Sequence, residues 1–435
     1  MRLDNRCAVF LASAVLAAPS FAFELTAKQR QLNIESFEHV WTTVRDKHWQ
    51  AKPGGLDWQA VHDELRPKIE KADSMDAARA VMSDMLGRLH QTHFGIVPAE
   101  VYSDEGESHG RGDITTGMDV RVVGAQALVT SVEPGSSAAA QGVKRGWQIL
   151  KIGDADLEPI VKKLNETYKD STLREIVSRG SMLSRLQGNP GESTSIVFLD
   201  GGDQRVTKSI THAKPRGTLT QFGYLYPMHV WFESSQLGGS IGYVRFNIFL
   251  DPPRIMNLFA EAVQSCKKCD GVVIDLRGNP GGLGAMAMGM AGWFIDEKDR
   301  RLGTLYMRNT TIKFVVNPRV NTFAGPVAIL VDGASASTSE ILAGGMKDLG
   351  RARIFGTHTA AAALPSVFEK LPNGDGFQYA IANYISEGGK PLEGLGVTPD
   401  VATPLTRQAL LDGKDPALDA AVAWIKGRAG SRTEK

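Results

Sequence analysis

The sequence has few cysteines, almost no excess of charge and no long apolar segment. Its three cysteines are Cys7, Cys266 and Cys269, and its formal net charge is +1 at pH 7. Cys266 and Cys269 have no further pair of soft ligands at similar spacing, which excludes the usual four-ligand zinc site. The charge balance favours neither nucleic acid nor an anionic membrane surface as a partner.

The N-terminal residues have the pattern of a secretory signal. Arg2 and Arg6 precede an apolar stretch from Cys7 to Ala18, and residues 20–22 offer a small-x-small cleavage site. We therefore expect a signal peptide over residues 1–22 and a periplasmic or secreted mature protein. The stretch is shorter than the roughly 18 residues of a transmembrane helix, and the residues before Cys7 are no lipoprotein signal, so no membrane anchor is expected.

The cysteines of SCKKCDG remain in the mature chain. In an oxidising compartment, a local disulfide or two unpaired thiols at a helix end is favoured over a redox pair.

The chain is long enough for several domains, with 435 residues of which 42% are hydrophobic. Apolar residues have helical spacing up to about residue 97, and a polar, glycine-rich linker follows within residues 102–112. The next region has β-type segments with a helical insertion. From about residue 239, strands alternate with helices. This last pattern predicts an α/β unit with a largely parallel sheet. The expected divisions after the signal are 23–98, 113–215, 217–410 and 411–435.

A serine cluster follows one predicted strand. Residues 332–340 read DGASASTSE, and Ser337 with Glu340 forms the S-x-x-E pattern of a helix capping box. Taken alone, the cluster is compatible with a helix start or with a nucleophilic serine.

Two further motifs favour the nucleophile. VVIDLRGNPGG at 272–282, the serine cluster and PLEGLGVTPD at 391–400 together resemble the core of the C-terminal processing, or tail-specific, serine peptidases and their tricorn relatives. The resemblance implies a ClpP/crotonase-like core, a serine endopeptidase activity with no metal or organic cofactor, and Ser337 as the nucleophile. Glycines can bring backbone N–H groups close to a developing oxyanion, so Gly281 and Gly282 are candidate donors, with the N–H of Thr338 as the second donor.

The general base of the tail-specific branch is missing. That branch places a lysine in G-x-x-T-x-G-K, but residues 356–362 read GTHTAAA, with Ala362 at the lysine position. Lys370 is the nearest later lysine and lies beyond Pro365. Unless another group removes its proton, a serine hydroxyl is a poor nucleophile.

The tricorn branch offers a replacement. Residues 89–95, LHQTHFG, resemble that branch's L-G-D-S-H-F-G, which implies His93 as the base and Thr92 in the position of a serine. Glu393 in PLEGLG matches the supporting glutamate. His90 and His358 are competing candidates for the base, since a histidine is identified only by its surroundings.

A second resemblance concerns the β-type region. TGMDVRV and VTSVEPGSSAAAQGVKRGWQILKIGD resemble a PDZ domain, which implies an inserted PDZ-like β-rich domain. In such a module a peptide adds to the edge strand and its carboxylate binds backbone N–H groups, here at Thr116, Gly117 and Met118. Protein or peptide substrates, unfolded or recognised by their C-termini, are the expected partners.

Two other functions compete with the peptidase. An inactive peptide-binding protein on the same scaffold would explain the lost lysine, although it would have no need for both His93 and Glu393. An acyl-CoA enzyme is suggested only by fold analogy, a weak warrant. Self-association into a homo-oligomer stays open.

Overall fold

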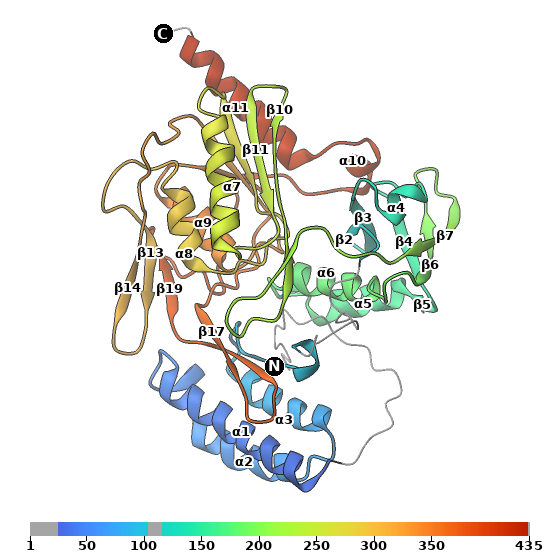
Figure 1. Cartoon of the computed structure of the whole chain (residues 1–435), viewed down its shortest axis with the longest axis vertical. Helices are drawn as coiled ribbons and strands as arrows, with labels where there is room; N and C mark the ends of the chain where they lie inside the picture. Colours follow the sequence, from blue (N-terminus) through green and yellow to red (C-terminus); the bar gives the residue numbers. More distant parts are fainter. Residues whose placement is uncertain (1–24, 103–114, 434–435) are drawn as a thin grey trace.

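The computed structural model describes residues 25–102 and 115–433 (Figure 1). The predicted signal peptide and nearly all of the predicted linker lie outside these residues. Within the described ranges, no helix is both long and apolar enough to span a membrane.

Three helices form the N-terminal region, as their apolar spacing predicts. They are α1 (Ala27–Lys47), α2 (Trp58–Glu70) and α3 (Met75–Gly87), and each begins at a side-chain cap, from Thr26, Asp57 and Ser74 respectively. Short 3₁₀ turns lie between α1 and α2 at Pro53–Gly55 and after α3 at Ala99–Val101. The helices pack on a three-stranded antiparallel sheet in the order β1-β18-β17, made of Gly95–Val97, Gly376–Ala380 and Ser366–Lys370. Residues 37–96 and 364–380 therefore share one hydrophobic core, although they lie far apart in the sequence.

The inserted region is an antiparallel sheet with helices. Its strand order is β2-β3-β4-β6-β7, with β5 paired to β4, and β2 is an edge strand. The predicted helical insertion forms α5 and α6, and α6 packs along β2. The elements are β2 (Met118–Val123), β3 (Gln126–Val132), α4 (Ser137–Ala140), β4 (Gln148–Ile152), β5 (Ala155–Asp156), α5 (Leu157–Thr167), α6 (Arg174–Arg185), β6 (Ser193–Leu199) and β7 (Arg205–Thr211).

The core is built on a sheet of six strands, β10-β11-β12-β15-β16-β20, parallel from β11 to β20 as predicted, with β10 antiparallel at one edge. Every residue of β12 and β15 is buried, which explains their continuous apolar sequences. The strands are β10 (Phe232–Leu237), β11 (Ile241–Phe246), β12 (Gly271–Asp275), β15 (Val327–Val331), β16 (Arg353–Gly356) and β20 (Val401–Ala402).

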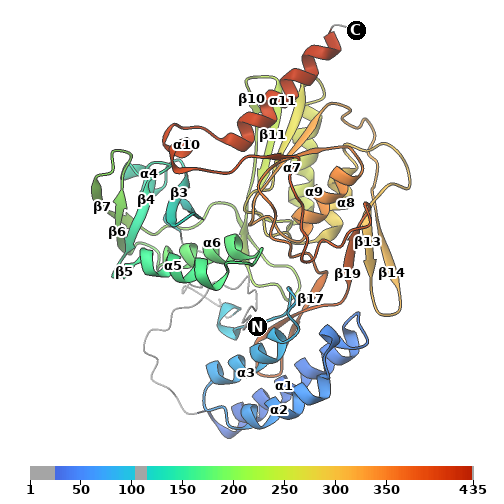
Figure 2. The same ribbon diagram turned by 180° about the vertical axis from the view of Figure 1, so that it is seen from behind.

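Helices cover both faces of this sheet. α7 (Pro252–Ser265), α8 (Gly284–Ala291) and α9 (Thr338–Asp348) pack against alternate strand residues such as Val272 and Ile274. α11 (Pro416–Thr433) packs on the other face, where Val273 points. Figures 1 and 2 show α11 along the sheet, the inserted region beside the core and the N-terminal helices at its far end.

The remaining elements lie around the core. Residues 376–385, GFQYAIANYI, have the composition of one continuous strand, but the chain forms β18 and then β19 (Asn383–Ser386) in a different sheet, because it leaves the first sheet at Ile381 and Ala382. β19 pairs with β13 (Arg301–Tyr306), which also pairs with β14 (Thr311–Val315). β8 (Thr218–Thr220) pairs with β9 (Met228–Val230), and α10 (Arg407–Leu411) precedes α11. Cys266 and Cys269 form a disulfide at the end of α7.

Candidate functional site

Ser337 lies at the turn between the central strand β15 and helix α9. Its φ and ψ are 54° and −117°, a conformation that L-residues rarely adopt and that a functional site can retain. Its neighbours Ala336 and Thr338 are buried, whereas Ser337 is only half-buried. The strained turn therefore leaves the side chain of Ser337 partly exposed between two buried neighbours.

Glu340 supplies the predicted carboxylate of the capping box. The N–H of Ser337 donates to Glu340 Oε2 at 3.0 Å and also points to the carbonyl of Ala362 at 2.8 Å. Glu340 is fully buried. Burial raises the pKa of Glu340 to about 7, and the hydrogen bonds that it accepts act in the opposite direction.

The glycine turn after β12 lies directly against the serine. A Cβ added to Gly281, whose φ is +102°, would lie 2.7 Å from the Ser337 Cβ and 2.8 Å from the Thr338 backbone nitrogen. Only glycine permits this approach. The Gly281 N–H donates to Asn279 Oδ1 at 3.0 Å. Of the three predicted oxyanion donors, Gly281 is therefore already hydrogen-bonded to Asn279, and Gly282 and Thr338 are the better candidates.

Asn279 was not singled out from the sequence. Its carbonyl oxygen accepts hydrogen bonds from the Ala336 N–H at 3.1 Å and from the Ser339 hydroxyl at 2.9 Å. The Thr338 hydroxyl donates to the carbonyl of Gly282 at 2.7 Å. Asn279, Thr338 and Ser339 therefore hold the glycine turn against the serine turn. All three residues belong to the N-P-G-G and S-T-S motifs, which could have indicated them.

Thr92, His93 and Glu393 form a hydrogen-bonded group. The Thr92 hydroxyl donates to Glu393 Oε2 at 2.9 Å and lies 2.7 Å from His93 Nδ1, and the Thr92 N–H donates to Glu393 Oε1 at 2.9 Å. Thr92 and His93 are buried between α3 and β1. Burial lowers the pKa of His93 to about 4, so the imidazole is neutral at pH 7. Burial raises the pKa of Glu393.

The segment after β16 connects this group to the serine turn. Ala362 accepts a hydrogen bond from the Ser337 N–H, and the next residue, Ala363, donates its N–H to Glu393 Oε2 at 3.0 Å. Ala362 is buried, and Lys370 is exposed at the end of β17. His90 and His358 are also exposed.

The inserted region contributes side chains to the same place. Arg121 of β2 forms an ion pair of 2.9 Å with Asp332, and Glu175 of α6 accepts the Gly333 N–H at 3.0 Å. Leu173, just before α6, packs in a small apolar cluster with Ala336, Ala360 and Ala362. Because these contacts join a separate sheet to the serine turn, no local sequence pattern indicates them.

The predicted peptide-binding turn precedes β2. The Gly117 N–H donates to Thr115 Oγ1 at 3.0 Å, and Thr116 and Met118 are buried. A Cβ on Gly117, whose φ is +80°, would lie 2.1 Å from the Ser136 Cβ, so glycine is required here. The edge strand β2 begins at Met118, and α6 lies along it (Figure 1).

Asp275 and Arg277 support the loop that follows β12 by ion pairing. Arg277 forms ion pairs of 2.7 Å with Asp275 and with Asp415, and the buried Asp275 also accepts the Tyr243 hydroxyl at 2.8 Å. This network fixes the strand end from which the glycine turn departs.

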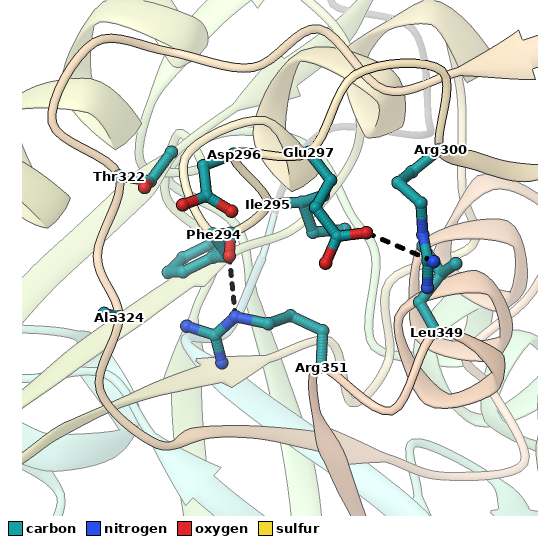
Figure 3. Close-up of a pocket in the computed structure, with 9 residues that line it drawn as sticks. All are labelled: Phe294, Ile295, Asp296, Glu297, Arg300, Thr322, Ala324, Leu349 and Arg351. Atoms are coloured by element: carbon teal, nitrogen blue, oxygen red, sulfur yellow. Dashed lines mark hydrogen bonds and ion pairs between the residues drawn. The ribbon is translucent and has the colours of Figure 1, made fainter.

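A cavity of about 200 Å³, bordered by the exposed Asp296 and Glu297, lies away from the serine turn (Figure 3). Arg351 crosses it and donates from Nε to the carbonyl of Phe294 at 2.6 Å. None of the predicted site residues lines this cavity. In the ranges that the structure describes, no three His, Cys, Asp or Glu side chains gather as they would around a metal ion.

Two family models match parts of the chain. Residues 240–403 match the model of peptidase family S41, and residues 33–87 match the tricorn protease C1 domain. The chain therefore contains a peptidase family S41 domain. This S41 chain is a serine-type peptidase, so the family and the enzyme class predicted from the sequence are confirmed.

Relatives align over most of the S41 chain. The carboxyl-terminal-processing protease of Picosynechococcus sp. is 25% identical over 421 residues, which cover 92% of this chain and 89% of the relative. The chloroplastic C-terminal processing peptidase of Tetradesmus obliquus is 23% identical over 381 residues, covering 84% of this chain and 76% of the relative.

Solved structures share the fold of this S41 peptidase. The photosystem II D1 C-terminal processing protease matches with a TM-score of 0.56 at 21% identity, covering 90% of this chain and 99% of that one. Mature CPAF matches with a TM-score of 0.61 at 14% identity, covering 92% and 97% of the two chains.

Proposed function

We propose that this S41 peptidase is an exported serine endopeptidase with Ser337 as nucleophile and His93 as general base, supported by Thr92 and Glu393. The observation that carries the proposal is the position of the Thr92 hydroxyl, which lies 2.9 Å from Glu393 Oε2 and 2.7 Å from His93 Nδ1. A buried carboxylate, a hydroxyl and an imidazole in a row have the chemistry of a supported base.

The hydroxyl determines which imidazole nitrogen carries the proton. Thr92 has one hydroxyl proton and donates it to Glu393, so it accepts a hydrogen bond from the N–H of His93 Nδ1. Nε2 of His93 then carries a lone pair and is the basic atom. The lowered pKa of His93, due to burial, keeps this lone pair available at neutral pH.

The reaction follows from these roles. Ser337 Oγ attacks the peptide carbonyl carbon as His93 Nε2 takes the hydroxyl proton. The tetrahedral intermediate collapses, the C–N bond breaks, and His93 returns the proton to the leaving amine. Water then hydrolyses the ester on Ser337 by the same sequence, which releases the acid product and the free serine.

Backbone N–H groups stabilise the oxyanion in this proposal. Thr338 is the first residue of α9, where the helix dipole favours negative charge, and its N–H is the first donor. The N–H of Gly282 is the second donor. Removing one such donor typically costs a hundred- to a thousandfold in rate. Gly281 brings the two turns together.

The inserted region is proposed to be a PDZ-like domain that recognises protein chain ends. Its edge strand β2 can accept an added peptide strand, with the carboxylate at the turn of Thr116, Gly117 and Met118. The core, with its parallel sheet covered by helices on both faces, is proposed to be ClpP/crotonase-like. Periplasmic or secreted localisation is proposed from the signal pattern at residues 1–22.

A fluorophosphonate probe tests the nucleophile. We expect the wild-type protein to be labelled once, on Ser337, and Ser337→Ala to be unlabelled and without peptidase activity. An unlabelled wild-type protein, or equal labelling of Ser337→Ala, would reject the proposal and favour the inactive peptide-binding protein.

A further inference from the structure

Glu340 is a buried acid to which the proposed reaction assigns no role. Each of its two carboxylate oxygens accepts two hydrogen bonds. Oε1 accepts from the Thr359 hydroxyl at 2.5 Å and the Ala361 N–H at 2.8 Å, and Oε2 accepts from the N–H groups of Ser337 and Ala362, each at 3.0 Å. One side chain therefore binds two separate segments, the serine turn and residues 359–362.

The same segment is bound from its other end by Glu393. The N–H of Ala363 donates to Glu393 Oε2 at 3.0 Å, directly after the two N–H groups that Glu340 accepts. Three consecutive backbone N–H groups thus point to two carboxylates, one beside Ser337 and the other beside Thr92. Ala361 takes a φ of +56° in this segment, a conformation that costs an alanine about 1 kcal/mol or more and that the surrounding hydrogen bonds must maintain.

This geometry places one covalent unit, Ala361 to Ala363, between the nucleophile and the carboxylate that supports the base. Resting on the proposed function, we infer that Glu340 is a positioning residue that sets the separation and orientation of Ser337 relative to the Thr92–Glu393 pair through this segment. Glu340 does not touch the substrate, and its effect is on how well the serine and the histidine are aligned.

Glutamine cannot replace this carboxylate without loss. If its NH₂ group takes the place of Oε2, it faces the N–H groups of Ser337 and Ala362. If the NH₂ takes the place of Oε1, it faces the N–H of Ala361. Either orientation leaves at least one buried N–H without an acceptor, which is unfavourable. Either the serine turn or residues 359–362 then lose a hydrogen bond to residue 340.

Labelling kinetics separate positioning from folding. The amplitude of fluorophosphonate labelling counts folded sites, and its rate constant measures the reactivity of the serine. For Glu340→Gln we expect full amplitude with a rate constant 10- to 100-fold lower, the size of effect caused by a misplacement of about 1 Å. On a peptide substrate, kcat should fall with KM unchanged. Glu166→Gln, the same change at an exposed position of α5, should behave as wild type.

Several outcomes would overturn the inference. A rate constant equal to that of wild type, or a reduced amplitude with an unchanged rate constant, would leave Glu340 with a structural role only. The proposed function fails separately, when wild type is unlabelled or Ser337→Ala is labelled.

If Glu340→Gln does not fold, Thr359 provides the second test. Its hydroxyl donates to Glu340 Oε1 and accepts the Val397 N–H at 2.7 Å. Thr359→Val should lower the rate constant several-fold, and Thr359→Ser, which keeps the hydroxyl, should restore it. Equal rate constants for the two variants would overturn the inference.

Discussion

The hydroxyl of Thr92 donates a hydrogen bond of 2.9 Å to Glu393, 301 residues later in the chain. If this contact orients His93, Thr92→Val should lower kcat about 10- to 100-fold because the imidazole loses the acceptor at Nδ1. Thr92→Ser keeps the hydroxyl and should stay within a few-fold of wild type. Steady-state kcat and KM on one peptide substrate provide the measurement, and equal activity of the valine and serine variants would contradict the assignment.

The identity of the base gives a second prediction. His93→Ala should reduce kcat/KM by at least about a thousandfold, since removing the base of a catalytic triad can cost about a millionfold in kcat. Lys370→Ala, His90→Ala and His358→Ala should retain near-wild-type activity because all three side chains are exposed. The four variants are measured side by side, and full activity in His93→Ala would refute the mechanism.

The glycine turn gives a third prediction. In Gly281→Ala, the new Cβ would lie 2.7 Å from the Ser337 Cβ, so the serine turn must move and kcat should fall at least a hundredfold. Gly413→Ala is the matched control, because Gly413 also has a positive φ, +71°, but no atom within 4 Å of the added Cβ. Similar activity of both alanine variants would mean that close approach at Gly281 is unimportant.

The ion pair between Arg121 and Asp332 gives a fourth prediction. Arg121 is buried, so Arg121→Met would leave acidic groups uncompensated and should lower the free energy of unfolding by about 3–5 kcal/mol. Arg66→Met removes two more exposed pairs, with Glu38 and Glu70, and should cost less, because exposed pairs contribute about 0–1 kcal/mol each. Urea unfolding measures both, and an equal cost would show that the buried pair contributes no more than the surface pairs.

His93 also gives a prediction on stability and pH. Its pKa is lowered by burial from 6.5 to about 4, so between these values the unfolded chain binds the proton more readily than the folded protein. The free energy of unfolding therefore falls as pH decreases through this window, by about 1.4 kcal/mol per pH unit from this group. Between pH 7 and 5, wild type should lose about 2 kcal/mol more than His93→Gln. Parallel pH profiles of the two proteins would contradict this.

Much of the fold follows from the sequence. The fully buried strands β12 and β15 are continuous apolar segments, and the helical spacing in α1 to α3 reflects the face that each buries, so local pattern alone indicates them. The composition of residues 376–385 does not show that they divide between two strands, since both parts are of β type and only the pairing partners of β18 and β19 separate them.

The sequence by itself indicated that this chain carries motifs of the tail-specific serine peptidases and their tricorn relatives, that Ala362 stands where a lysine would be, and that Ser337 follows an apolar strand. Motifs of this kind are local, and their residue types carry the chemistry. Only the tertiary structure decided that Glu393 contacts Thr92, that Glu340 binds the segment leading to Glu393, and that Arg121 and Glu175 of the inserted region contact the serine turn. The physical reason is that hydrogen bonds and ion pairs act over a few ångströms, whereas the partners are separated by tens to hundreds of residues, and only folding brings them within that range.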